Sequence, residues 1–394
     1  MKIAIIGAKG VPATYGGVER HTEELALGLV SKGHDVTVYS RKWYTNYDGS
    51  EYKGIKIKNI SSIKTKNFDT ISNVLFSTLD AVRGGFDVIH YQGVGPALLS
   101  FIPRILSPKT KVFVTFHCED FKHDKWSGFA RFMLKTGERA ACKFPHKTIT
   151  VSKLLKYKVD NFYDSKAEYI PNGITIKENL SITRESGDVF EKFNIEPGKY
   201  IIAVTRLVRH KGVHLLIDAY RNMSNDLKNK YKLVIVGGGT FGDKYEDELK
   251  EKIAGDSNII MTGMQSGKDL ENLFVGAKIF SHASSAEGLP ITVLEAMNYE
   301  RPVVVSDIPE HMEVVGEDKG LTFKSGDTND LIKKLEFALS DINKTFIDEM
   351  SFKAKNLVKN EYNWLRVVEK TDAAYRNAME ERKIRIHEHR KVRV

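Results

Sequence analysis

Short apolar runs alternate with amphipathic stretches along the whole chain. The runs are rich in Ile and Val at consecutive positions, which is typical of strands buried on both faces of a sheet. In the first half they lie at residues 3–7, 35–40, 87–91, 112–116 and 148–151. In the second half they lie at residues 200–204, 233–236, 259–261, 279–282 and 303–306. Strands that alternate with helices predict parallel sheets covered by helices, and two such sets predict two doubly wound α/β domains.

Helical periodicity is found between the first two predicted strands and again near residue 370. Apolar side chains recur every three or four residues at 18–29, before a Lys32-Gly33 stop signal, and again at 363–383. Residues 176–187 are polar and weakly periodic, and a Glu196-Pro197-Gly198 turn precedes the next strand. We therefore predict an N-terminal domain at 1–178, a C-terminal domain at 190–365, and a C-terminal helix with a basic tail at 366–394.

The composition is that of an ordinary globular protein. A chain of 394 residues, 41% hydrophobic and 28% charged, usually forms two domains. Cys118 and Cys142 match neither a disulfide nor a metal pattern, which favours a reducing compartment. The apolar run after Met1-Lys2 is too short for a secretory signal, and the nearly apolar run 94–106 contains two prolines and is shorter than a membrane span of about 20 residues. We therefore expect a cytoplasmic protein that does not cross a membrane.

The excess of basic over acidic residues is confined to the first half of the chain and to its last residues. Residues 1–178 hold 27 Lys+Arg against 17 Asp+Glu, a balance of +10, whereas residues 179–394 hold 33 against 34, a balance of −1. Residues 382–394 alone carry six basic residues against Glu388. Residues 126–143 interleave aromatic with basic side chains, as a core helix with a basic outer face or an amphipathic helix on a membrane would. The basic half is either a solvated surface or a site of attraction for a membrane, a lipid-linked phosphate or nucleic acid.

A glycine-rich loop, GAKGVPATYGG at 7–17, separates the first strand from the first helix. Gly16 and Gly17 at the helix start allow backbone N–H groups to approach a phosphate, and the helix dipole adds favourable partial charge. The spacing is neither the dinucleotide fingerprint G-x-G-x-x-G nor a Walker-type G-K-[ST]. A plain strand–helix turn is the alternative, because a glycine-rich loop alone is not specific.

A basic segment, Arg206-Leu207-Val208-Arg209-His210-Lys211-Gly212, follows the strand at 200–204. This places Arg206 and Lys211 beyond the carboxyl end of a parallel strand, where ligands of open α/β sheets bind. Two cations there suit a diphosphate, both as part of a bound donor and as a departing group. Solvent-facing basic residues are the alternative interpretation.

The segment AEGLPITVLEAM at 286–297 follows the strand at 279–282. Pro290 fits the first turn of a helix, which puts Glu287 in the preceding loop and Glu295 about one and a half turns into the helix. The two carboxylates can then accept hydrogen bonds from the hydroxyls of one ligand, such as a sugar ring and a ribose, while the free N–H groups of the helix start face phosphates. A capped amphipathic helix explains Glu295 equally well, but it does not explain Glu-Gly-Leu-Pro.

With these motifs in this order, the chain resembles family 4 of the retaining glycosyltransferases, which have the GT-B fold, over nearly its whole length. The motifs are GGVER at 16–20, Thr115-Phe116-His117, Ile170-Pro171-Asn172-Gly173, Arg206…Lys211-Gly212 and the E-x7-E pair Glu287/Glu295. The resemblance implies two Rossmann-like domains facing across a cleft, with the C-terminal helix crossing back to the N-terminal domain. It also implies a nucleotide-diphosphate sugar as co-substrate, no cofactor and no divalent metal, and the sequence has no Asp-x-Asp loop that would argue otherwise.

The resemblance implies a role for each site residue. The residues implied in catalysis are His117, Arg206, Lys211 and Glu287. The residues implied in donor binding are Gly16, Gly17, Arg206, Lys211, Glu287, Gly288, Leu289, Pro290 and Glu295. In this pattern the cations bind the diphosphate, Glu287 contacts sugar hydroxyls, Glu295 binds the ribose, and His117 contacts the transferred sugar or its anomeric region.

A finer resemblance concerns the acceptor. The loop at 7–17 and Phe116-His117-Cys118-Glu119-Asp120 are similar to a rhamnosyltransferase-like branch that acts on polyprenyl-diphosphate sugars, although Cys118-Glu119 departs from its pattern. Candidate acceptor-binding residues are Tyr15, Glu119 and Asp120. His117 could instead be a packed core histidine, but its place before two acidic residues favours the active site. His282 also ends a strand, and there we expect a packed core histidine.

We therefore predict a retaining glycosyltransferase with its donor held mainly by the C-terminal domain and its glycan or lipid-linked acceptor on the N-terminal domain. A same-face displacement is expected, because Arg206 and Lys211 can stabilise the departing phosphate and no carboxylate stands out as a nucleophile. Domain closure would exclude water. Three alternatives are a hydrolysing epimerase of similar fold, a nucleic-acid-binding protein and an inactive nucleotide-sugar-binding subunit. No nucleic-acid-binding module signature is found, and the intact Arg206, Lys211, Glu287 and Glu295 set argues against the third.

Overall fold

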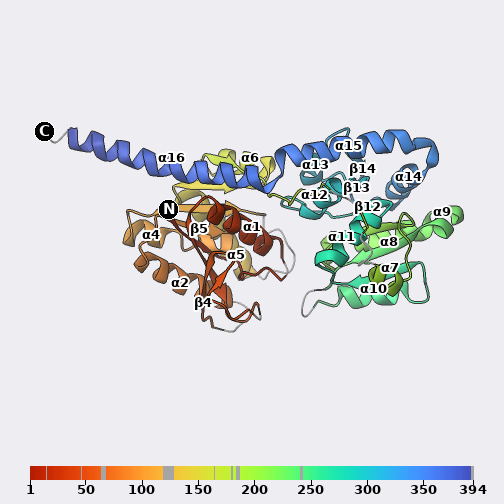
Figure 1. Cartoon of the computed structure of the whole chain (residues 1–394), viewed down its shortest axis with the longest axis horizontal. Helices are drawn as coiled ribbons and strands as arrows, with labels where there is room; N and C mark the ends of the chain where they lie inside the picture. The colour runs from red at the N-terminus through yellow and green to blue at the C-terminus, as the bar shows by residue number, and fades with distance from the viewer. Residues whose placement is uncertain are drawn as a thin grey trace. The chain divides into compact units, whose positions relative to one another are not determined.

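The computed structural model describes the chain in two compact units, each built on a parallel sheet. It describes all residues except 15, 46, 64–67, 119–127, 164, 179–180, 183–186, 240–242 and 392–394, and also omits the side chains of 68, 128–132, 187–188 and 382–391. The first unit comprises Met1–Gly173 together with Trp364–Val394, and the second comprises Ile174–Asn363. Figure 1 shows both units, coloured along the chain.

The first unit contains an eight-stranded sheet in the order β3-β4-β2-β1-β5-β6-β7-β8. Its strands are β1 (Lys2–Ile6), β2 (Asp35–Arg41), β3 (Glu51–Tyr52), β4 (Ile55–Ile60), β5 (Val88–Gln92), β6 (Lys111–Phe116), β7 (Lys147–Thr150) and β8 (Ala167–Tyr169). All pairs are parallel except the β3–β4 hairpin. The strand order reverses between β1 and β5, so the loops after these two strands lie at the topological switch point, where open α/β sheets bind ligands.

Helices cover this sheet, and one of them comes from the end of the chain. They are α1 (Gly17–Ser31), α2 (Phe68–Arg83), α3 (Val94–Ala97), α4 (Phe101–Leu106), α5 (Gly128–Lys143), α6 (Lys153–Phe162) and α16 (Trp364–Lys391). Helix α16 packs on α1, where a Cβ atom on Gly28 would lie 2.2 Å from Val368 Cγ2. Asp372 of α16 also pairs with His34 at 2.8 Å. The expected return of the C-terminal helix to the N-terminal unit is therefore present in the structure.

The second unit contains a six-stranded, fully parallel sheet in the order β11-β10-β9-β12-β13-β14. Its strands are β9 (Tyr200–Val204), β10 (Lys232–Val236), β11 (Ile259–Gly263), β12 (Ile279–His282), β13 (Val303–Ser306) and β14 (Leu321–Phe323). Its helices are α7 (Gly187–Lys192), α8 (Val213–Asn222), α9 (Asn225–Lys230), α10 (Tyr245–Ile253), α11 (Gly267–Gly276), α12 (Ile291–Asn298), α13 (Pro309–Val315), α14 (Thr328–Leu339) and α15 (Lys344–Glu361), with 3-10 turns η3 (Arg209–Lys211) and η4 (Asp341–Asn343). Here the switch point lies between β9 and β12.

The two predicted strand sets are confirmed, and every predicted strand lies within two residues of an observed one. Two Rossmann-like α/β units are therefore established. No prediction was made for the edge strands β3, β8 and β14, nor for β4 next to β3, whose Ile and Lys residues alternate between buried and exposed positions. None of the described helices combines the length and the apolar character that crossing a bilayer needs.

Candidate active site

The second unit brings Lys211 and Glu287 together at the carboxyl edge of its sheet. Lys211 ends the short turn η3 after β9, and Glu287 lies in the loop after β12, the strand next to β9. Gly212 lets the first loop lie against the second, because its φ is 67° and a Cβ atom there would be 2.1 Å from the Ala283 carbonyl oxygen. The Lys211 Nζ atom donates to Glu287 Oε1 at 2.5 Å.

Backbone and serine hydrogen bonds hold these two loops in register. The Ser285 N–H donates to the His210 carbonyl oxygen at 2.8 Å. Ser284 Oγ donates to the same carbonyl at 3.2 Å and to the Ala286 carbonyl at 3.0 Å. The position of Glu287 relative to Lys211 is therefore set by the backbone as well as by the ion pair.

The Lys211–Glu287 pair is largely withdrawn from solvent, with side chains 12% and 9% exposed. Burial raises the pKa of Glu287, but the Lys211 ammonium together with the neighbouring His282 and His311 rings outweighs burial and holds that pKa well below its usual range. Glu287 is therefore a carboxylate at any physiological pH. Removing either partner would leave an uncompensated buried charge.

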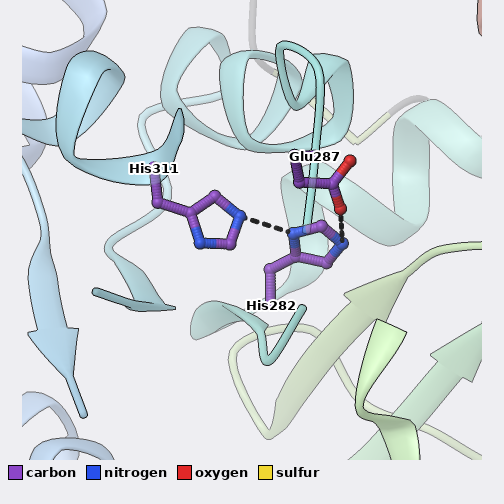
Figure 2. Close-up of side chains that lie close together, drawn as sticks. All are labelled: His282, Glu287 and His311. Carbon is purple, nitrogen blue, oxygen red and sulfur yellow. Dashed lines mark hydrogen bonds and ion pairs between the residues drawn. The ribbon is translucent and has the colours of Figure 1, made fainter. Parts of the chain in front are cut away.

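Two histidines extend the cluster from Glu287 into the core, as Figure 2 shows. His282, the last residue of β12, places Nε2 3.6 Å from Glu287 Oε1, and its Nδ1 lies 3.0 Å from Nε2 of His311 on α13. His311 Nδ1 lies 3.0 Å from the Ser306 carbonyl oxygen. A carbonyl oxygen only accepts, so His311 Nδ1 carries its proton and, in the neutral ring, Nε2 accepts from His282 Nδ1–H. The free lone pair of neutral His282 is thus on Nε2, facing Glu287.

Burial keeps both imidazoles neutral. It lowers the pKa of His282 to about 3, against the opposing effect of Glu287, and it lowers the pKa of His311 to about 4. His282 Nε2 has no hydrogen-bond partner among the described residues. A buried acceptor without a donor is costly, so this atom needs a functional explanation.

The same three side chains are close enough together to be considered as metal ligands. His282, Glu287 and His311 each offer a ligand atom, and these atoms lie within 4.8 Å of one another. However, the two imidazoles are hydrogen-bonded to each other and Glu287 already holds the Lys211 ammonium. A cation would have to break both interactions and lie beside Lys211, so the donor set does not fit a resident metal.

The remaining predicted donor-site residues of the second unit lie in the same two loops and in α12. Arg206 is exposed, and its guanidinium makes no hydrogen bond or ion pair within the part of the chain that the structure describes. Pro290 caps α12, which begins at Ile291, so Glu287 precedes the helix and Glu295 lies in it, as the sequence indicated. The Glu295 side chain is buried. Gly288 and Leu289 complete the loop between Glu287 and the cap.

In the first unit, the glycine-rich loop is tied to α1 by acidic side chains. Gly16 has a φ of 102° and Gly17 begins α1. Lys9 N–H donates to Glu19 Oε1 at 3.2 Å, and Ala13 N–H donates to Glu23 Oε2 at 2.5 Å. These backbone donors are engaged within the protein, so the contact of this loop with a phosphate stays a prediction.

His117 is a buried residue at the carboxyl edge of the first sheet. Its Nε2–H donates to Oε1 of Gln92 at 2.9 Å, which leaves the lone pair of the neutral ring on Nδ1. Burial lowers the pKa of His117 well below its ordinary value, and the His21 ring lies 4.8 Å away edge-on. The sequence analysis missed Gln92 and His21. Tyr15, Glu119 and Asp120, the candidate acceptor-binding residues, lie outside the described residues.

The sequence analysis also missed the alignment of His282 and His311. The expectation of a core histidine at position 282 is correct as to burial, but it overlooked the 3.6 Å approach to Glu287. The available signal was that His282 ends the strand whose following loop carries Glu287. No sequence signal connects His311, because it lies on a different helix.

Both halves of the chain match known protein families. Residues 186–364 match the family described as Glycosyl transferases group 1, and residues 15–178 match Glycosyltransferase Family 4. The chain is a family 4-like glycosyltransferase. The alternative of a hydrolysing epimerase is accordingly not favoured, and the rhamnosyltransferase-like branch is left as a proposal.

Individual relatives agree with this assignment. An uncharacterised glycosyltransferase of Methanocaldococcus jannaschii is 28% identical, over 96% of this chain and 99% of its own length. O-antigen chain mannosyltransferase C of Escherichia coli is 23% identical, over 82% of this chain and 85% of its own. The crystal structure of Anabaena HepE in complex with UDP and glucose superposes with a TM-score of 0.78 at 18% identity, covering 96% of this chain and 100% of that one. At that identity the likeness shows the fold alone, which is GT-B.

Proposed function

We propose that this transferase moves a sugar from a nucleoside-diphosphate sugar to a glycan or lipid-linked acceptor, with retention of the anomeric configuration, in the synthesis of a surface polysaccharide or glycoconjugate. The observation that carries the proposal is the buried Lys211–Glu287 pair at the switch point of the second sheet, with the exposed Arg206 in the same loop as Lys211. Two cations and a carboxylate there match a ligand that combines a diphosphate with a hydroxyl-rich ring.

In the proposed reaction the protein stabilises the leaving group more than it activates a nucleophile. Arg206 and Lys211 neutralise the charge that develops on the departing diphosphate, and Glu287 accepts hydrogen bonds from the sugar whose bond breaks. Glu295 holds the ribose, and the loop from Gly288 to Pro290 lines the donor. Glu287 is assigned to the sugar hydroxyls and no other carboxylate stands out as a covalent nucleophile, so we favour a same-face displacement without a divalent metal.

The relatives support this choice of substrates. HepE was crystallised with UDP and glucose, and the Escherichia coli relative is named for building an O-antigen chain. On the acceptor side, His117 presents Nδ1 as an acceptor at the carboxyl edge of the first sheet, which suits a sugar hydroxyl. We place a polyprenyl-diphosphate sugar among the candidate acceptors.

We further propose that the protein works on the cytoplasmic face of a membrane. Lys135, Arg139 and Lys143 are exposed on α5 at intervals of four residues, so they form one basic side of that helix. Helices α4, α5 and α6 follow successive parallel strands, and right-handed crossovers put them on the same face of the sheet. Contacts at the helix ends link them: the ring of Phe101 in α4 lies 5.7 Å from that of Phe144, the residue after α5, and Tyr163, the residue after α6, donates to Glu138 of α5 at 2.6 Å.

The neighbouring helices α4 and α6 carry exposed large apolar side chains. Ile105 and Leu106 of α4 are 69% and 57% exposed, and Tyr157 and Phe162 of α6 are 62% and 73% exposed. Exposed apolar groups next to lysines are typical of surfaces that rest on an anionic leaflet. The basic tail and the aromatic residues from Trp126 to Phe132, which also entered the sequence-based hypothesis, lie outside the side chains that the structure describes.

A donor screen followed by product analysis tests the proposed function. Thermal shift with UDP-, GDP-, ADP- and dTDP-sugars identifies the nucleotide, and NMR of the anomeric proton in the product reads the stereochemistry. We expect stabilisation by one nucleotide class and a product with the donor's anomeric configuration. An inverted product would overturn the retaining mechanism, and turnover of the donor to an epimer without any acceptor would favour the epimerase.

A further inference from the structure

We propose that donor binding exchanges the partner of Glu287: the diphosphate takes the Lys211 ammonium, and His282 takes up one proton from solvent and donates Nε2–H to the Glu287 carboxylate. His282 is in this scheme a positioning residue that acts through Glu287. The inference rests on the proposed function, because it requires a diphosphate-containing donor at this site.

The starting point is that Lys211 is already engaged before any ligand arrives. Its ammonium contacts Glu287 at 2.5 Å, and both side chains are about nine-tenths buried. A diphosphate at the carboxyl edge of β9 brings two negative charges, which compete with Glu287 for the same ammonium. Any interaction of the Lys211 ammonium with the phosphates weakens its interaction with Glu287. A buried carboxylate without a counter-charge is strongly unfavourable.

His282 is placed to compensate that loss. Its Nε2 atom lies 3.6 Å from Glu287 Oε1 and has no hydrogen-bond partner among the described residues. While the ring is neutral, this contact joins two acceptors and gives no hydrogen bond. Once Nε2 carries a proton, the same contact becomes a charge-assisted hydrogen bond, so only a small closure of the gap is required.

The hydrogen bonds of His282 and His311 in the free protein already suit a protonated His282 ring. Its Nδ1–H donates to His311 Nε2 at 3.0 Å, and His311 in turn donates to the Ser306 carbonyl oxygen at 3.0 Å. An imidazolium donates from both nitrogens, and here Nδ1 already has its acceptor. Protonation therefore needs no tautomer change and no rotation of either ring, and His311 stays neutral.

The charged and titratable groups that face His282 decide when the proton binds. They are Glu287 from the loop after β12, His311 from α13, and Lys211 and His210 from η3. Burial and Lys211 favour the neutral ring, whose pKa is about 3, and Glu287 favours the charged one. Moving Lys211 toward a diphosphate weakens one opposing charge and leaves Glu287 uncompensated, so both changes raise the pKa of His282.

This exchange gives donor binding a defined pH dependence. Between the pKa of His282 in the free protein and its higher pKa in the complex, the complex holds one more proton than the free protein. Affinity then rises as the pH falls, by about tenfold per pH unit at full uptake. The proton returns to solvent when the nucleotide leaves, so the catalytic cycle is balanced.

Calorimetry measures this proton directly. Binding of UDP-glucose or GDP-mannose, whichever stabilises the protein, is measured at pH 7 in phosphate and in Tris, whose ionisation enthalpies differ. These donors are diphosphate diesters that do not titrate near neutral pH, so any uptake belongs to the protein. We expect uptake of up to one proton per donor, and a dissociation constant that rises between pH 6 and pH 8. Binding without uptake would overturn the exchange while leaving the proposed function intact, whereas binding of no nucleotide sugar would overturn the proposed function.

Three variants assign the proton to His282. His282→Gln keeps an N–H group near Glu287 without a titrating charge, and His282→Phe removes the polar group. Both should bind donor with no uptake and with a flat pH profile. His214→Gln, which changes a half-buried histidine of the same unit that bonds to Tyr245, should keep the wild-type uptake. If His282→Phe does not fold, His282→Gln decides the matter, and uptake retained in that variant would contradict the proposal.

Discussion

Lys211 and Glu287 form a buried ion pair that spans the switch point of the second sheet, whereas Arg206, five residues earlier in the chain, is exposed and its guanidinium makes no hydrogen bond or ion pair with the described residues. The two cations of the same motif therefore differ in what they do for the unliganded protein. The Lys211 side chain is part of the packed site, whereas the exposed Arg206 guanidinium can bind a ligand.

This difference predicts distinct effects of two alanine substitutions. Arg206→Ala should weaken donor binding by about 1.5–3 kcal/mol, the value of a charge-assisted contact, with no change in stability. Lys211→Ala should abolish most transfer and also destabilise the protein by about 3–5 kcal/mol, because Glu287 is left buried and charged. Kinetics and thermal unfolding of both variants check this. Arg209→Ala is the matched control, since Arg209 pairs with Glu248 on the surface, and near-normal kinetics of Arg206→Ala would contradict the donor assignment.

The two glutamates of the E-x7-E pair should separate by kinetic effect. Glu287→Gln should lower kcat, because the proposed contact is with the sugar whose bond breaks and strengthens in the transition state. Glu295→Gln should mainly raise the KM for the donor, since ribose contacts are the same before and during the reaction. Steady-state kinetics with nucleotide affinity measured separately distinguishes them. Equal effects of both substitutions on kcat and on affinity would argue against this division.

Activity should not depend on a divalent metal. His282, Glu287 and His311 lie close enough to ligate a cation, but each is engaged by the others or by Lys211. Transfer should therefore survive dialysis against EDTA and should not rise when magnesium or manganese is restored. A requirement for added metal would mean that the Lys211–Glu287 pair opens to admit a cation.

Attachment to anionic membranes should depend both on the basic side chains of α5 and on the exposed apolar side chains of α4 and α6. Changing Lys135, Arg139 and Lys143 to Glu should reduce sedimentation with anionic liposomes, because each nearby cation contributes about 1 kcal/mol and salt screens that attraction. Tyr157→Ser with Phe162→Ser should reduce it without removing the salt dependence.

The control for this experiment changes exposed lysines of the second unit, Lys244, Lys333 and Lys344, to Glu. It alters the net charge equally, so it should leave sedimentation nearly unchanged if the face is specific. If the unmodified protein stays in the supernatant at low salt, the basic half is only a solvated surface.

The contact between α1 and α16 predicts a stability effect far from the active site. A Cβ atom at position 28 would lie 2.2 Å from Val368 Cγ2, so Gly28→Ala should cost about 1–3 kcal/mol through overpacking despite the better helix propensity of alanine. Val368→Ala makes room, and the double variant should be more stable than the sum of the two single effects indicates. Strict additivity in thermal unfolding would contradict this packing.

Much of the architecture could be predicted because strands that are buried on both faces of a parallel sheet consist of nearly uninterrupted apolar runs rich in Ile and Val. The runs at β1, β9 and β12 could be placed almost to the residue, and the motifs after them follow from the rule that ligands meet strand ends. Edge strands such as β14 are short and half-buried, so no such run marks them. The pairing of His282 with His311 could not be predicted, since it depends on how α13 packs beside β12.

The division of the chain at Gly173 and Trp364 also orders the events of synthesis. Residues 174–363 form one continuous segment, so this unit has all of its chain before the last helix is made. The other unit does not, because its core includes Val367, Val368, Ala374, Tyr375 and Ala378. On the ribosome, the apolar side of α1 therefore lacks its partner until residues more than three hundred positions later have been translated, so we expect the core of the first unit to be completed only after the second unit has been made.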